Sequence, residues 1–131
     1  MSKKLLFNKG GSSGGTSITV DRFFNGWIKT NGLVTETEYS LVTDYIDISL
    51  ASGDIEIALT SLTGLEYELI CVGMYSSSYQ FLKLIFPSGY EGSATIKESD
   101  IVSNTKYIRI EWSCTTGDAM SNGDIDVTIT M

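Results

Sequence analysis

The chain has 131 residues, 42% of them hydrophobic and 19% charged, which is typical of one folded domain with its own core. Its 16 acidic and 9 basic residues give a net charge of −7, which disfavours nucleic acid and anionic membranes as partners, because both require neutralisation of phosphate. Histidine is absent, which excludes Ser-His and Cys-His nucleophile pairs and histidine zinc ligands.

The first 17 residues are predicted to form a flexible N-terminal arm. Leu5, Leu6 and Phe7 follow two lysines, and glycine and serine dominate residues 10–17. A Gly/Ser-rich run behaves as a random-coil tether, so the short apolar-basic segment can bind a partner while the domain moves freely. A disordered terminus is the alternative. The apolar segment is shorter than the ~7–15 residues of a secretory signal, and no apolar run reaches the ~20 residues of a membrane span.

Residues 18–131 are predicted to form a single all-β domain. Three segments alternate apolar and polar side chains, which is the pattern of strands with one buried face. These segments are residues 54–60, 107–112 and 125–131. Residues 67–75 and 81–86 are apolar on both faces, so they are expected to be central and more fully covered strands.

Turn-forming residues divide the domain into short pieces. Glycine, asparagine, aspartate and serine recur throughout it, and residues 95–101 could form at most one helical turn. About eight strands with turn signals roughly every ten residues indicate two packed antiparallel sheets. The predicted fold is an antiparallel, jelly-roll-like β-sandwich.

Several short motifs in this domain resemble those of a known class of β-sandwich. In chain order they are Thr43-Asp44-Tyr45-Ile46-Asp47-Ile48, Met74-Tyr75 before a serine turn, and Lys106-Tyr107-Ile108-Arg109-Ile110. From about Phe24 to Met131 this order resembles the galactose-binding-like jelly-roll modules of bacteriophage tail, baseplate and head-fibre proteins. The resemblance implies a carbohydrate ligand and a location on the surface of a phage virion. The N-terminal arm likewise looks like those that attach small virion proteins to larger assemblies.

The candidate ligand-binding residues are loop tyrosines and the polar side of residues 107–112. Sugars are recognised by flat aromatic faces with planar polar groups beside them. The predicted set consists of Tyr75, Tyr79, Gln80, Tyr90, Tyr107, Arg109 and Glu111. The alternative is that these tyrosines cap a sheet edge and that Arg109 and Glu111 form a surface pair of little energetic value.

Both tryptophans and both cysteines are assigned to apolar surroundings. Trp112 is in register with core positions, whereas Trp27 follows an aromatic cluster and is expected in the core or in an interface with a neighbouring subunit. Cys71 and Cys114 lie in strand-like segments without metal-ligand spacing, so small buried hydrophobic residues are favoured over a disulfide.

The acidic residues give no clear metal site or catalytic pair. Asp21, Asp118, Asp124 and Asp126 carry the carboxylates that calcium prefers, but their spacing is not that of an EF-hand, and a solvated strand face has the same pattern. No cofactor is therefore predicted. A glycosidase needs two carboxyl groups about 5–9.5 Å apart, one with a raised pKa, and no acid lies in a strongly apolar sequence setting. We expect a protein without enzymatic activity, and a small hydrolase is the least favoured hypothesis.

Taken together, these features predict a phage virion accessory protein that binds host-surface carbohydrate. The arm would contact other virion structural proteins, and a homo-oligomer, such as a trimer, would multiply weak sugar contacts. The alternative is a capsid, tail or fibre subunit whose aromatic residues make protein–protein contacts and bind no glycan.

Overall fold

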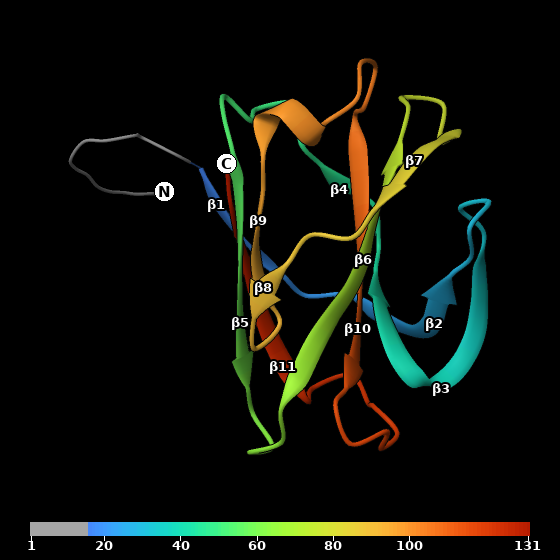
Figure 1. Cartoon of the computed structure of the whole chain (residues 1–131), viewed down its shortest axis with the longest axis vertical. Helices are drawn as coiled ribbons and strands as arrows, with labels where there is room; N and C mark the ends of the chain where they lie inside the picture. Colours follow the sequence, from blue (N-terminus) through green and yellow to red (C-terminus); the bar gives the residue numbers. More distant parts are fainter. Residues whose placement is uncertain (1–15) are drawn as a thin grey trace.

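A computed structural model describes residues 16–131, so the proposed arm residues Leu5, Leu6 and Phe7 lie outside the described part. Two antiparallel sheets pack against each other as a β-sandwich (Figure 1), which confirms the predicted fold class. The jelly-roll connectivity stays a prediction. Within residues 16–131 no helix is long and apolar enough to cross a membrane.

The strands are β1 (Ser17–Val20), β2 (Phe23–Ile28), β3 (Val34–Thr43), β4 (Ile46–Asp47), β5 (Ile55–Ser61), β6 (Tyr67–Tyr75), β7 (Phe81–Ile85), β8 (Gly89–Tyr90), β9 (Ser93–Ile96), β10 (Tyr107–Cys114) and β11 (Ile125–Thr130). Sheet A has the order β1-β11-β5-β9-β8, and sheet B has the order β2-β3-β10-β6-β7, with β4 also paired to β10. A single 3-10 turn, Glu98–Asp100, follows β9 and agrees with the one helical turn expected there. Thr16 and Met131 exchange two backbone hydrogen bonds of 2.8 Å beside β1 and β11.

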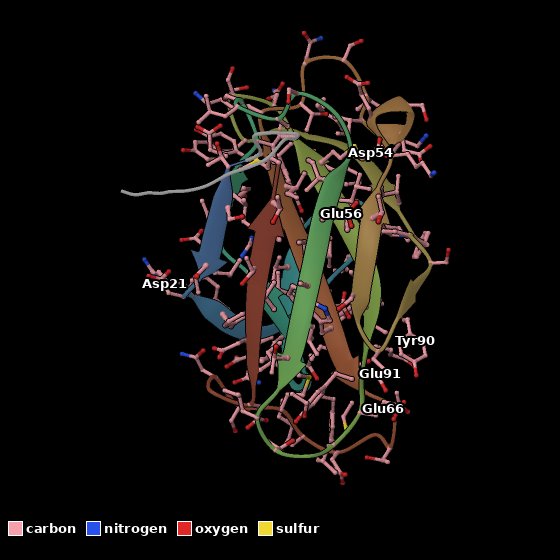
Figure 2. The ribbon with its side chains drawn as sticks, turned by 90° about the vertical axis from the view of Figure 1, so that its left-hand side faces the viewer. Asp21, Asp54, Glu56, Glu66, Tyr90 and Glu91 are labelled. Carbon is pink, nitrogen blue, oxygen red and sulfur yellow. The ribbon has the colours of Figure 1, made fainter. Side chains whose placement is uncertain are left out.

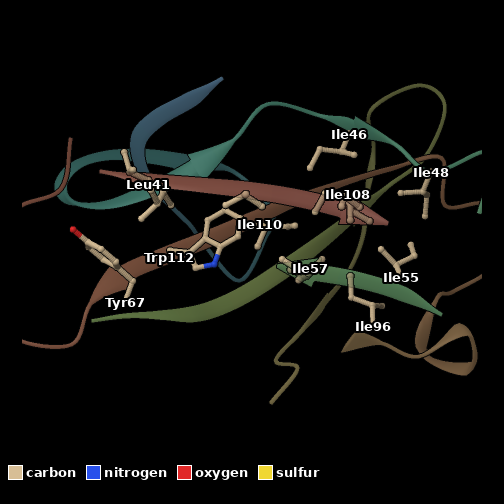
Figure 3. Packing of buried hydrophobic residues seen from close by; sticks show 14 of the residues in the cluster. Leu41, Ile46, Ile48, Ile55, Ile57, Tyr67, Ile96, Ile108, Ile110 and Trp112 are labelled. Carbon is tan, nitrogen blue, oxygen red and sulfur yellow. The ribbon is translucent and has the colours of Figure 1, made fainter. Parts of the chain in front are cut away.

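The core lies between the sheets and is built from the alternating apolar residues of the strands (Figure 3). Ile55 and Ile57 of β5 face Ile108, Ile110 and Trp112 of β10 across this layer, and all five are almost fully buried. Because neighbouring side chains on a strand point to opposite faces, the polar residues between them point outward. The alternation in the sequence therefore predicted the core side of these strands correctly.

The two strands expected to be central differ in position. β6 lies between β10 and β7, as predicted, but β7 is an edge strand of sheet B, and Leu82 on it is exposed. The apolar residues on the outer face of β7 are explained by local contacts, not by a central position in the sheet. Phe81 packs against Tyr75, and Leu84 packs against a small second apolar cluster on the outer face of sheet B.

That second cluster forms because the β2–β3 hairpin folds over the outer face of sheet B. The pairing of β2 with β3 shifts between Asn25 and Gly26, and Figure 1 shows β3 curving strongly. The fold-back brings Ile28 against Val42 and Cys71. The outer face of sheet B is thus covered at one end and open at the other.

The two tryptophans have different environments. Trp112 is fully buried, as predicted, whereas Trp27 on the edge strand β2 is 41% exposed, so its expected place in the core is wrong. On β2 it is Gly26 and Ile28 that turn inward, and Trp27 between them points away. An interface role for Trp27 stays a prediction. Cys71 and Cys114 are both buried and free of a disulfide, as the sequence favoured.

Candidate ligand-binding site

Four tyrosines and one arginine meet on the open part of the outer face of sheet B. We call this group, Tyr45, Tyr75, Tyr79, Tyr107 and Arg109, the tyrosine–arginine cluster. Tyr75 and Tyr107 are direct cross-strand neighbours on β6 and β10, and Tyr79 comes from the turn between β6 and β7. Tyr45 lies at the centre, with its ring centroid 5.2, 4.8 and 5.9 Å from those of Tyr75, Tyr79 and Tyr107.

Tyr79 and Tyr107 form a parallel stack at the surface. Their ring centroids are 4.8 Å apart with an interplanar angle of 7°, and the Tyr79 hydroxyl donates to that of Tyr107 at 3.5 Å. This hydrogen bond raises the pKa of Tyr79. Tyr79 has a φ of 66°, a conformation that is unfavourable for a non-glycine residue. The turn maintains it, because Ser76 accepts hydrogen bonds from the backbone N–H groups of Tyr79 and Gln80.

Tyr75 packs edge-on against Tyr45, which in turn contacts both rings of the stack. Tyr75 is 2% exposed, and its hydroxyl donates to the carbonyl oxygen of Gly32 at 2.8 Å. Burial raises the pKa of Tyr75 to about 12. Gly32 has a φ of 86° and packs so closely on Phe81 that a side chain there would collide with the ring. Tyr75 thus joins the hairpin tip to the cluster and, contrary to expectation, is too buried to contact a ligand directly.

Arg109 is half-buried and fixed in orientation. Its Nε donates to the carbonyl oxygen of Thr43 at 2.8 Å, and its guanidinium carbon lies 4.7 Å from the ring centre of Tyr45 and 6.0 Å from that of Phe24. Cation–π contacts of this kind contribute about 0.5–1 kcal/mol at exposed sites and more where water is excluded. The backbone hydrogen bond and the two rings leave the guanidinium little freedom.

An open groove adjoins the cluster. Its volume of about 760 Å³ falls within the ~300–1,000 Å³ that is usual for small-molecule sites. The groove is lined by Phe23, Phe24, Asn25, Val34, Glu36, Asp44, Tyr45 and Arg109. Aromatic, amide, carboxylate and guanidinium groups therefore share one surface with the exposed edge of the tyrosine–arginine cluster.

Glu111 belongs to the covered end of sheet B and not to this surface. It is 5% exposed, and its Oε1 accepts hydrogen bonds from the N–H of Ile28 at 2.9 Å and from the Cys71 thiol at 3.4 Å. Desolvation raises the pKa of Glu111 above its ordinary value. This corrects two expectations, because Glu111 is not in the binding strip, and one acid does lie in an apolar setting. The cause of both is the hairpin that folds over it.

The remaining predicted residues are divided between the two sheets. Gln80 is exposed beside Tyr79 in the β6–β7 turn. Tyr90 is 80% exposed on β8 at the edge of sheet A (Figure 2), away from the tyrosine–arginine cluster. The structure therefore unites Tyr79, Tyr107 and Arg109. The predicted set did not include Tyr45, although the Thr43-to-Ile48 motif contains it, nor Phe24.

The four aspartates considered as calcium ligands do not come together. In the part of the chain that the structure describes, no group of three or more acidic, cysteine or histidine residues could hold a metal ion. Asp124 accepts a hydrogen bond from the N–H of Ser121, and Asp118 accepts one from the hydroxyl of Thr116. Both carboxylates thus stabilise turns.

No protein-family model, curated protein or solved structure matches this chain significantly. The resemblance to phage modules therefore depends on the short sequence motifs alone.

Proposed function

We propose that this protein is a non-enzymatic carbohydrate-binding protein whose ligand lies against the tyrosine–arginine cluster and its groove. The observation that carries the proposal is the surface stack of Tyr79 and Tyr107 beside the oriented guanidinium of Arg109. A sugar ring offers an apolar C–H face to an aromatic ring and hydroxyl groups to planar polar side chains. Tyr79 is 54% exposed, so much of its surface is open to a ligand.

Glycan binding can be tested by displaying many copies of the full chain on beads and probing them with an array of oligosaccharides and bacterial surface polysaccharides. Tyr79→Ala is expected to weaken binding about 2- to 10-fold, because it removes the exposed aromatic contact. Tyr90→Ala is the matched control, since it removes an exposed tyrosine from sheet A. The proposal fails if no glycan is retained, or if Tyr90→Ala reduces binding and Tyr79→Ala does not.

We further propose that the protein acts on the surface of a phage virion, where its N-terminal arm contacts other virion proteins. The motif resemblance supports this location, and the sequence of residues 1–17, with Leu5, Leu6 and Phe7, supports the arm. Multiple copies, as in a trimer, would strengthen weak sugar contacts through a high effective concentration.

Removal of residues 1–15 is expected to abolish incorporation into the assembled particle and to leave glycan binding unchanged. Replacing Leu5, Leu6 and Phe7 with serine in the full chain should have the same effect, because it removes the apolar contacts and keeps the length of the arm. Co-purification with particles measures incorporation. Truncated protein that still incorporates at the wild-type level would show that the arm is not the anchor.

A structural subunit that binds no glycan is the second candidate. It is favoured by exposed apolar side chains on the β2–β3 hairpin, namely those of Trp27, Leu33 and Tyr39. Exposed apolar groups near a sheet edge are typical of protein–protein contact sites. The glycan array separates the two candidates, because this one predicts no retention of any glycan.

A further inference from the structure

We infer that the sugar bound at this site carries an anionic group with two oxygens, a carboxylate or a phosphate, and that Arg109 binds it. This inference rests on the proposed function and adds the chemical class of the ligand. It starts from the distribution of charge around the tyrosine–arginine cluster.

Three cations lie in or beside the cluster, and each lies over an aromatic ring. Arg22 lies over Phe24, Lys106 over Tyr107, and Arg109 over Tyr45. Two of the three cations have an acidic partner. Arg22 lies 3.8 Å from Asp44, and Lys106 lies 4.0 Å from Asp47. Within residues 16–131, Arg109 has no carboxylate within ion-pair distance, although the chain as a whole is acidic.

Arg109 also has donors to spare. Its Nε–H is used by the carbonyl oxygen of Thr43, but neither Nη1 nor Nη2 donates a hydrogen bond to any residue in the described part of the chain. The guanidinium presents its N–H groups in a rigid planar fork that matches the two oxygens of a carboxylate or phosphate. Because Thr43 and the flanking rings already restrict this side chain, little further entropy is lost on binding.

The acids nearby leave room for an anion. Asp44 accepts the backbone N–H of Tyr45 at 2.8 Å through Oδ1 and faces Arg22 through Oδ2. Asp47 accepts two hydrogen bonds from Ser49, which lower its pKa, and faces Lys106. Glu36 is the other acid of the groove, and it is exposed to solvent, where its charge is screened. Arg109 is thus the group at this surface whose charge remains to be matched by a ligand.

The test compares acidic sugars with matched neutral ones on the full chain displayed in many copies. The probes are trigalacturonate and its methyl ester, 3′-sialyllactose with lactose as its neutral parent, and mannose 6-phosphate with mannose. We expect the anionic member of at least one pair to bind about 10-fold more tightly than the neutral member, as for a hydrogen bond to a charged group. The carboxylate and phosphate pairs identify which anion is preferred.

Variants then assign the selectivity to Arg109. Arg109→Gln is expected to remove the preference for the anion, and Arg109→Lys, which retains the charge without the planar fork, to reduce it to about 3-fold. Both should weaken binding of the neutral sugars much less than binding of the anionic ones, because a neutral sugar loses only a hydrogen bond to an uncharged hydroxyl group. Lys97→Gln, which removes the same charge beyond β9 of sheet A, should preserve the preference. Thermal unfolding of each variant shows whether loss of the Thr43 hydrogen bond has altered the fold. If Arg109→Gln does not fold, the comparison of anionic with neutral sugars is made with Arg109→Lys.

The inference is overturned if neutral and anionic members of every pair bind equally, or if Arg109→Gln weakens both members to the same extent. In that case Tyr79-dependent binding of neutral glycans would still support the proposed function. Retention of no glycan at all, neutral or anionic, would instead refute the proposed function itself.

Discussion

Replacing Trp112 with alanine is expected to lower the free energy of unfolding by about 3–5 kcal/mol. Trp112 is fully buried between the sheets, its Nε1 donates to the carbonyl oxygen of Gly92 at 3.0 Å, and its ring meets Phe23 edge-on at 6.0 Å. The substitution leaves a large cavity in a close-packed layer, and it also deprives a buried carbonyl group of its donor. Such a loss is a large fraction of the ~5–15 kcal/mol that stabilises a typical domain.

Urea unfolding followed by circular dichroism measures this effect, and Trp27→Ala is the matched control. Trp27 is 41% exposed on β2, so its replacement should change the unfolding free energy by about 1 kcal/mol or less. Trp112→Phe, which keeps most of the ring but loses the N–H donor, should fall between the two. Equal losses for Trp112→Ala and Trp27→Ala would contradict the burial of Trp112 and the exposure of Trp27.

Replacing Glu111 with glutamine is expected to leave the free energy of unfolding unchanged or to raise it at neutral pH. The substitution should also make the free energy of unfolding less dependent on pH. The amide oxygen can still accept the N–H of Ile28, but no buried charge remains. Desolvation raises the pKa of Glu111 above 4.5 in the folded protein, so the folded state binds a proton more tightly than the unfolded state. Wild-type stability should therefore decrease as the pH rises from about 4.5 through the folded-state pKa, and the glutamine variant should lack this decrease.

Glu111→Ala separates the charge from the hydrogen bond. It leaves the Ile28 N–H without its acceptor, so it should be about 1–3 kcal/mol less stable than Glu111→Gln. Urea unfolding between pH 4 and pH 8 provides the measurement, and the other titratable groups are common to all three proteins. Parallel pH profiles for the wild type and Glu111→Gln would contradict the raised pKa.

The strands and the core could be predicted because burial between two sheets leaves a local signature. Apolar residues must occupy every second position of such a strand, as Ile55 and Ile57 do, since a one-residue shift would turn the whole apolar face outward. Trp112 shares this period with its strand and was placed correctly for that reason. This part of the fold depends mainly on short-range patterns.

The outer face of sheet B could not be predicted in the same way. Tyr107, Arg109 and Glu111 have the same spacing on β10, yet only Glu111 lies under the hairpin. The fold-back accompanies the pairing shift at Asn25 and Gly26, where the Asn25 side chain donates a hydrogen bond to the carbonyl oxygen of Met120, 95 residues away along the chain. No periodicity in the sequence predicts such a shift in pairing.

The candidate site was predicted in part for a related reason. The sequence predicts Tyr79 as a loop tyrosine and Tyr107 as part of the polar side of residues 107–112, and cross-strand pairing of β6 and β10 brings the two together. Tyr90 has the same sequence character but belongs to the other sheet. The sequence pattern does not predict Tyr45 as a site residue, because Tyr45 lies between β3 and β4, outside any alternating segment. It reaches the cluster only through tertiary packing.

The paired hydrogen bonds between Thr16 and Met131 have a practical consequence for handling the protein. They bring the two ends of the domain together beside β1 and β11 of sheet A, whereas the tyrosine–arginine cluster lies on the outer face of sheet B. A biotin, fluorophore or fusion partner coupled at Met131 would therefore leave from sheet A, on the side of the sandwich opposite the cluster. Immobilisation through Met131 should therefore leave the candidate site facing the solution.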